Sequence, residues 1–165
     1  MPSTQRRPPR LYVVKKSAIH GRGVFAATTI SKGTRIIEYV GERISHADAA
    51  IRYTGEADPK RIILLFTVNR RMVIDAAVGG NDARFINHAC APNCETVDEG
   101  GHIFIEAIRR IEPGAELTYD YHLSLGARRT KKDEIAYQCR CGSRKCRGTM
   151  IAPPRKRRPR KQRAD

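Results

Sequence analysis

The residues best suited to chemistry lie in one stretch, Arg84–Cys94, with the sequence RFINHACAPNC. It gathers two carboxamides, one imidazole and two thiols around a single proline. Asn and Pro interrupt regular structure, so the stretch predicts a tight loop. Loops that hold polar groups at fixed positions are frequent functional sites. Taken alone, the stretch also fits a surface turn with two incidental cysteines.

Three further cysteines follow near the C-terminal end in a C-x-C-x4-C pattern, namely Cys139, Cys141 and Cys146. Thiolates at this spacing suit a tetrahedral zinc ion. A structural zinc site has four ligands, so a distant cysteine would complete it, and Cys90 and Cys94 are both candidates. Three free thiols on a loop are the alternative. Five cysteines are an odd number and the N-terminus has no apolar export signal, so disulfide bonds are not expected.

A pair of tyrosines, Tyr119 and Tyr121, flanks Asp120. In an extended segment, alternation puts both tyrosines on one side and the carboxylate on the other. Two adjacent phenols can line an aromatic slot and present hydroxyls to a polar head group. An ordinary half-buried strand with tyrosines on one face is the alternative.

The net charge of +15 comes mostly from the two ends of the 165-residue chain. Residues 1–10 and 151–165 carry 10 of the 32 basic residues and 1 of the 17 acidic ones. We expect a disordered basic arm at 1–10 and a disordered basic tail at 152–165. The cluster at 153–163 could bind nucleic acid or act as a nuclear localisation signal, and a solvated tail is the alternative. No apolar run is long enough to span a membrane, so no membrane association is expected.

The elements that must position these side chains are short strands separated by frequent turns, with few helices. This pattern predicts a mainly β fold without βαβ repeats. Strands are expected over 11–14, 35–40, 61–69, 72–75, 94–97 and 102–108, and a turn at Glu99-Gly100-Gly101. The two glycines in 17–26 indicate a sharp turn or a close approach of the backbone to another group. Ser45 and Asp48 form a capping-box pattern, which predicts a short helix from Ala47 to Tyr53. One helical turn is expected at 83–86.

In this order, the motifs resemble those of SET-domain lysine methyltransferases of the trithorax-like group that carry a post-SET zinc motif. The matching segments are Gly21-Arg22-Gly23, Tyr39-Val40-Gly41, residues 84–93, residues 116–121 and the three clustered cysteines. Ala89 stands where the family usually has serine, and Arg22 replaces a common bulky aromatic. The compactness of the chain suggests a minimal version of the family, such as a bacterial one.

The resemblance implies a fold of several small curved β-sheets with a pseudoknot, in which the Asn87–His88 segment passes beneath residues 116–121. The implied domains are a SET domain at 11–123, a basic linker at 124–134 and a post-SET zinc segment at 135–151. Zinc would be held by Cys90, Cys139, Cys141 and Cys146, with Cys94 a buried bystander. S-adenosylmethionine would be bound by His20, Gly21, Arg22, Gly23, Arg84, Asn87, His88, Tyr121 and Tyr137.

The resemblance also implies a function. Tyr121 would be the catalytic tyrosine, Tyr39 would line the same lysine channel, and Tyr119 stands at the family's Phe/Tyr switch, which implies mono- or dimethylation. The implied substrate is a histone, with histone H3 the first choice, or another basic DNA-associated protein. The enzyme would be intracellular, at nuclear chromatin in a eukaryotic cell or in a bacterial cytoplasm. A non-enzymatic, zinc-stabilised nucleic-acid-binding protein is the competing interpretation. The oligomeric state is not encoded in any pattern.

Overall fold

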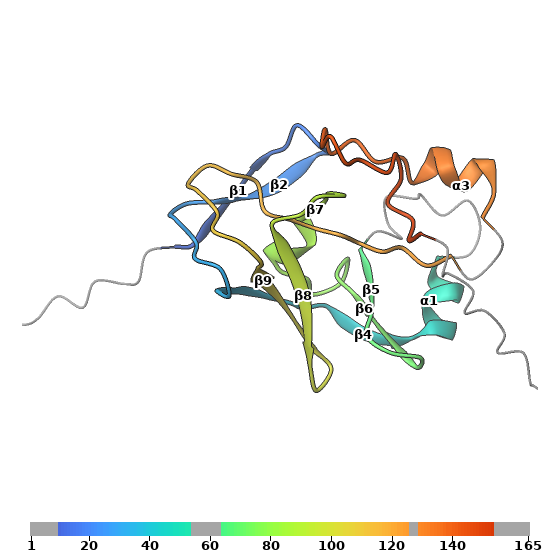
Figure 1. Cartoon of the computed structure of the whole chain (residues 1–165). Helices are drawn as coiled ribbons and strands as arrows, with labels where there is room; N and C mark the ends of the chain where they lie inside the picture. The colour runs from blue at the N-terminus through green and yellow to red at the C-terminus, as the bar shows by residue number, and fades with distance from the viewer. Residues whose placement is uncertain (1–9, 54–63, 126–128, 154–165) are drawn as a thin grey trace, which may run out of the picture.

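Short strands dominate the computed structural model, which describes residues 10–53, 64–125 and 129–153 (Figure 1). The expected arm and tail therefore lie almost wholly outside the described residues. The strands are β1 (Tyr12–Lys16), β2 (Arg22–Ala26), β3 (Arg35–Tyr39), β4 (Glu42–Ser45), β5 (Leu65–Thr67), β6 (Met72–Asp75), β7 (Asn87–His88), β8 (Cys94–Glu99), β9 (His102–Ala107) and β10 (Thr118–Tyr119). The helices are α1 (His46–Arg52), the 3₁₀ helix η1 (Asp82–Phe85) and α3 (Lys131–Ala136).

The described strands form four small sheets, which confirms the mainly β fold. Two sheets have two strands, β1-β2 and β10-β7, and two have three, β3-β9-β8 and β4-β6-β5. The expected hairpins are present, since β5 pairs with β6 and β8 pairs with β9 in antiparallel register. Strand β5 is shorter than the expected 61–69, of which residues 61–63 lie outside the described part. The expected turn at 17–26 is also shorter, because β2 begins at Arg22 and pairs with β1.

The hydrophobic core lies against the largest sheet, β3-β9-β8. Strand β9 alternates strictly, with Ile103, Ile105 and Ala107 buried and the residues between them more exposed. This alternation is what a strand with one face on the core requires. The core also includes Val24, Ile30, Ile36, Ile74, Ile86, Ile111 and Leu117.

The two α-helices begin at capping boxes. At α1, Ser45 and Asp48 exchange side-chain-to-backbone hydrogen bonds as expected, and the helix begins one residue before the expected Ala47. Helix α3 was not expected, and it begins inside the expected basic linker at 124–134. Thr130 and Asp133 cap it in the same manner. The sequence shows no helical periodicity of apolar residues here, because α3 has one large apolar residue, Ile135. This residue is 77% exposed and does not pack on the core. Neither helix is long and apolar enough to cross a membrane, as far as the described residues go.

A parallel pairing between β7 and β10 joins the two segments that carry the central motifs. Asn87 is opposite Thr118 and His88 is opposite Tyr119. The β8–β9 hairpin lies between them in the sequence, so the chain returns to a segment that it left about thirty residues earlier. This is the contact that the expected pseudoknot requires, and it places Asn87, His88 and Tyr121 around one region.

Candidate active site and metal centre

The Asn87 carboxamide connects the central loop to the glycine turn that precedes β2. Its Nδ2 atom donates to the backbone carbonyls of His20, at 3.2 Å, and Arg22, at 3.0 Å. The 3₁₀ helix η1 delivers Asn87 to this position and is itself capped by Asn81, whose side chain accepts from the Ala83 amide. No group among the described residues donates a hydrogen bond to the Asn87 Oδ1 atom, so this oxygen is available as an acceptor.

A cavity of about 350 Å³ opens where these segments meet. Four of the predicted cofactor residues line it, namely His20, Asn87, His88 and Tyr121. Another wall comes from the C-terminal segment, through residues that were not among the predicted cofactor residues: Ile135, Ala136, Gln138, Cys139, Arg140 and Met150. Ile19 completes the lining. The exposed Ile135 is thus explained, since it faces a cavity of the size that binds small molecules.

The remaining predicted cofactor residues, Gly21, Arg22, Gly23, Arg84 and Tyr137, do not line this cavity. The guanidinium groups of Arg22 and Arg84 lie 4.1 and 4.8 Å from the centre of the Phe85 ring. Arg22 borders a second cavity beside β1. The Arg84 Nε atom is buried without a hydrogen-bond partner among the described residues.

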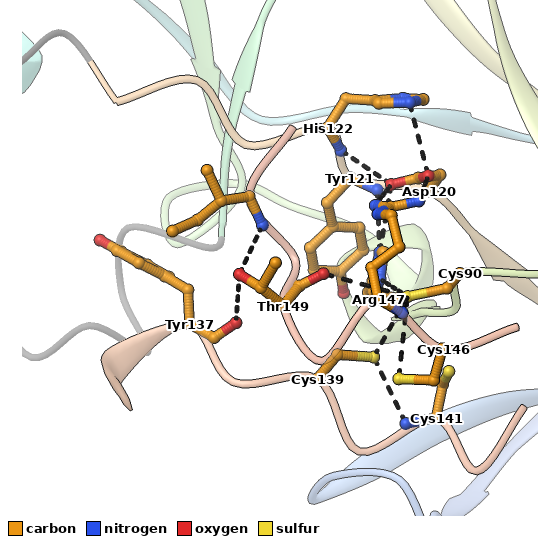
Figure 2. A network of polar contacts seen from close by, with 12 residues as sticks. Cys90, Asp120, Tyr121, His122, Tyr137, Cys139, Cys141, Cys146, Arg147 and Thr149 are labelled. Atoms are coloured by element: carbon orange, nitrogen blue, oxygen red, sulfur yellow. Dashed lines mark hydrogen bonds and ion pairs between the residues drawn. The ribbon is translucent and has the colours of Figure 1, made fainter. Parts of the chain in front are cut away.

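Tyr137, the last of these residues, is buried, and its carbonyl accepts from the Met150 amide at 2.9 Å. In Figure 2 its ring points away from the cysteines. Tyr137 therefore stabilises the segment that forms the cavity wall, and its ring does not line the cavity.

His88 is held as a neutral imidazole. Burial lowers its pKa to about 4, although the Asp120 carboxylate, 3.5 Å from Nδ1, opposes the shift. Nδ1 accepts a hydrogen bond of 3.1 Å from the Tyr121 amide. The proton must then be on Nε2, which donates to the Cys90 thiol at 3.3 Å. His88 thereby joins the cavity to the cysteine loop.

Three tyrosines form a cluster next to the cavity, in which Tyr39 and Tyr119 are buried and Tyr121 is half-buried. The rings of Tyr119 and Tyr121 are 4.9 Å apart, as the predicted alternation requires. The Tyr39 hydroxyl donates to the Leu64 carbonyl at 2.9 Å, and the Tyr121 hydroxyl donates to the Ile86 carbonyl at 2.7 Å. In the described part of the chain, the Tyr119 hydroxyl has no such partner. Burial raises the pKa of all three phenols, so each is protonated at neutral pH.

Four cysteine thiols converge on one point (Figure 2). The Sγ atoms of Cys90, Cys139, Cys141 and Cys146 all lie within 4.8 Å of one another. The Cys90 to Cys139 distance is 3.7 Å. A tetrahedral zinc ion with Zn–S bonds of about 2.3 Å has S–S edges of about 3.8 Å. The donor set and its spacing therefore fit zinc.

Position, and not acidity, distinguishes the clustered thiols from Cys94, which lies outside the group of four. Burial raises the pKa of the Cys90 and Cys139 thiols. At Cys141, hydrogen bonds from backbone amides and neighbouring thiols outweigh burial and lower the pKa to about 7. Cys94 is fully buried at the start of β8, where burial raises its pKa to about 12. Cys94 is therefore a core thiol, whereas Cys90 joins the cluster.

An ion pair fastens the cysteine-rich segment to the tyrosine segment. Arg147 donates to both Asp120 oxygens, at 2.5 and 2.9 Å, and its backbone amide donates to the Cys90 thiol (Figure 2). Burial opposes ionisation of Asp120, but the hydrogen bonds from Arg147 and the His122 amide outweigh it and keep the Asp120 pKa below its usual range. Bidentate pairs of this kind fix orientation as well as distance.

A comparison with known families agrees with this geometry. The SET domain family matches residues 21–122, which is more than half of the chain. The chain belongs to the SET domain family. The match includes β2, the central loop and the tyrosine segment, and it ends before the wall formed by residues 135–150. The SET domain thus supplies one side of the cavity, and the cysteine-rich segment beyond it supplies the other.

Relatives of this SET domain carry names that state an activity. The chain is 40% identical over 139 residues to human "Histone-lysine N-methyltransferase 2D", and 43% identical over 141 residues to "Histone-lysine N-methyltransferase trithorax" of Drosophila melanogaster. It is 40% identical over 157 residues to "Histone-lysine N-methyltransferase, H3 lysine-4 specific" of Saccharomyces cerevisiae. These alignments cover 82%, 81% and 88% of this chain but only 2%, 4% and 13% of the relatives.

Proposed function

We propose that this SET domain is a protein-lysine N-methyltransferase that uses S-adenosylmethionine. The observation that carries the proposal is the shared position of Tyr121, which lines the 350 Å³ cavity and also packs against Tyr119 in the tyrosine cluster. A cavity for a methyl donor and a slot for a lysine would then meet at one side chain. The names of the relatives support the same activity.

The residues around the cavity fit this cofactor. His20, Asn87, His88 and Tyr121 would hold it from the SET side, and the spare Oδ1 of Asn87 suits a cationic amino group. By motif, further residues are proposed to support cofactor binding without lining the cavity: Gly21, Arg22, Gly23, Arg84 and Tyr137. When bound, S-adenosylmethionine supplies a methyl group on a sulfonium sulfur that is already activated for transfer.

Tyr39, Tyr119 and Tyr121 would align the target amine and exclude water. Alignment of two reacting groups accounts for a large part of catalysis when the donor is already activated. A protonated lysine has no lone pair, and a desolvated slot favours the neutral amine. Since their own pKa values are raised, the three phenols act as hydrogen-bonding groups and not as bases at neutral pH.

Zinc is the proposed structural metal, held by Cys90, Cys139, Cys141 and Cys146. When bound, it supplies a cross-link between the central loop and the C-terminal wall of the cavity. His88 and Arg147 would support it through their contacts with Cys90. Both contacts are typical of the outer groups that orient metal ligands.

The proposed substrate is a histone, with histone H3 the first choice, and the proposed products are mono- and dimethyl-lysine. The relatives' names support a histone, and one of them names H3 lysine 4. The proposed place of action is chromatin, and the basic tail, which lies outside the described residues, is proposed as a nucleic-acid contact.

The test is methyl transfer from labelled S-adenosylmethionine to histone H3, with cofactor binding followed separately by calorimetry. Tyr121→Phe removes the hydroxyl beside the reaction centre, so transfer should fall by roughly 100-fold while cofactor binding persists. Tyr12→Phe, which changes a tyrosine outside the cluster, should leave the rate unchanged. If the wild-type protein neither transfers methyl to any lysine-rich substrate nor binds the cofactor, the enzyme proposal fails and the nucleic-acid-binding interpretation takes its place.

A further inference from the structure

The Glu116 carboxylate lies behind the cavity wall and contacts two residues that shape it. The Ser17 hydroxyl is 2.8 and 2.9 Å from the two carboxylate oxygens. The Asn87 Nδ2 atom donates to Oε1 at 2.7 Å. The Glu116 backbone is fixed as well, since its carbonyl accepts from Asn93 Nδ2 at 2.8 Å. The carboxylate is thus anchored and points toward the turn that precedes β2.

Both partners of Glu116 hold that turn. Ser17 Oγ accepts from the amides of Ile19, at 2.9 Å, and His20, at 3.4 Å. Asn87 binds the carbonyls of His20 and Arg22 on the same turn. Since Ile19 and His20 line the cavity, Glu116 sets the position of one cavity wall through two independent hydrogen-bonded routes.

The Glu116 carboxylate approaches the backbone closely at Gly23. A Cβ atom at Gly23 would lie 2.3 Å from Glu116 Oε1, which is well inside any allowed contact. The glycine of the second G-x-G position is therefore required here by the carboxylate, as well as by any ligand. This explains a motif residue that does not line the cavity itself.

The charge of Glu116 is not neutralised locally. No Lys, Arg or His side chain in the described ranges forms an ion pair with it, whereas the half-buried Asp120 is paired with Arg147. Its two partners, a hydroxyl and an amide, are neutral. An uncompensated carboxylate next to a cavity attracts cations into that cavity more strongly than it attracts neutral molecules. Its influence extends at least to Tyr121, because Glu116 adds to the effect of burial in raising the Tyr121 pKa.

We propose that Glu116 is a positioning residue that holds the 19–22 turn against the cofactor, and that its charge favours the methyl donor over the spent product. The inference rests on the proposed function. In the transfer, the amine lone pair forms the new N–C bond as the S–C bond breaks and its electron pair returns to sulfur. The positive charge moves to the amine, so S-adenosylhomocysteine leaves as a neutral thioether that Glu116 no longer attracts.

The test compares affinities for S-adenosylmethionine and S-adenosylhomocysteine by calorimetry. Glu116→Gln keeps an oxygen acceptor for Ser17 and Asn87 but removes the charge. It should weaken binding of the methyl donor by roughly three- to tenfold and leave product binding within about twofold. Glu112→Gln, an exposed glutamate paired with Arg110 in the same stretch, is the matched control and should change neither affinity.

Ser17→Ala separates positioning from charge. It removes one route to the turn and leaves the carboxylate in place, so both ligands should bind more weakly by a similar factor and their ratio should stay constant. The inference is overturned if Glu116→Gln weakens both ligands equally or neither, or if Ser17→Ala alone changes the ratio. Should Glu116→Gln fail to fold, a changed affinity ratio in Ser17→Ala would still overturn the inference. A wild-type protein that binds neither ligand would instead refute the proposed function.

Discussion

Hydrogen bonding distinguishes the three clustered tyrosines from one another. The hydroxyls of Tyr39 and Tyr121 are each committed to a backbone carbonyl. The Tyr119 hydroxyl has no partner in the described part of the chain, although its residue is only 6% exposed. A hydroxyl that is not committed to a protein acceptor can bind a water molecule or a ligand group. On the proposed function, Tyr119 is the one of these three phenols that is free to hold a water next to the target amine.

Tyr119→Phe should change the product and not only the rate. Removing the hydroxyl frees space beside the amine, so the fraction of trimethyl-lysine should rise roughly tenfold, a barrier change of about 1.4 kcal/mol. Mass spectrometry of the methylated peptide measures this directly. Ready trimethylation by the wild-type protein, with no difference in the variant, would show that Tyr119 is not a switch.

At the scale of elements, one buried carboxylate connects α1, β4 and β6. Asp75, at the end of β6, is fully buried and accepts from Arg52 and from Tyr53, each at 2.7 Å. Arg52 also pairs with Glu42 on β4. Burial opposes ionisation of Asp75, but the hydrogen bonds from Tyr53, Arg52 and the Ala77 amide outweigh it and lower the Asp75 pKa. This sheet bears β5, whose Phe66 contacts Tyr39.

Asp75→Asn should lower the free energy of unfolding at pH 7 by about 1–3 kcal/mol, because it removes the charged acceptor that Arg52 and Tyr53 share at a buried position. A carboxyl whose pKa is lower in the folded state stabilises above its ordinary pKa of 3.8 and loses this effect as the pH falls below it. The gap between wild type and variant, measured by urea titration, should thus be constant above about pH 5 and narrow below 3.8. Glu42→Gln, which changes the exposed partner of Arg52, should cost less than about 1 kcal/mol. An equal loss of unfolding free energy in Asp75→Asn and Glu42→Gln would contradict the stabilising role of the buried Asp75 carboxylate.

At the scale of the whole molecule, the cavity is assembled from two parts of the chain that are far apart in sequence. The SET side is fixed by the β7–β10 pairing, and the other wall follows α3. Among the contacts that join them are the cysteine cluster and the Asp120–Arg147 pair. Structural zinc sites usually supply folding energy to the segment that holds them. The second wall should therefore depend on metal, whereas the core sheet should not.

Removing zinc with a chelator should speed amide hydrogen exchange at residues 137–151 and leave β3, β8 and β9 protected. Cofactor affinity should fall by roughly tenfold or more as the wall loosens. Cys141→Ser should reproduce both effects. The control is Cys94→Ala, which should keep one zinc per chain by metal analysis because Cys94 lies outside the cluster. Loss of metal in that control, or unchanged exchange after chelation, would disprove the assignment.

The sequence by itself determined the features that depend on neighbouring residues. The capping box of α1, the hairpin turn at Glu99-Gly100-Gly101 and the alternation of β9 are local patterns with local causes. The family was also readable, because five short motifs in one order are far more specific than any single motif. The side of the strand on which Tyr119 and Tyr121 lie followed from alternation alone.

Tertiary structure decided which distant groups meet. Spacing left Cys90 and Cys94 as equal candidates for the fourth thiol, and only the family resemblance favoured Cys90. Only the chain path sends Cys94 into the core at β8 and Cys90 toward a cluster 49 residues away. The sequence likewise did not show that Ile135 and Gln138 line the cavity, or that Tyr137 lies outside its lining. Contacts of this kind depend on how sheets pack and where the chain returns, and no local pattern of residues records that path.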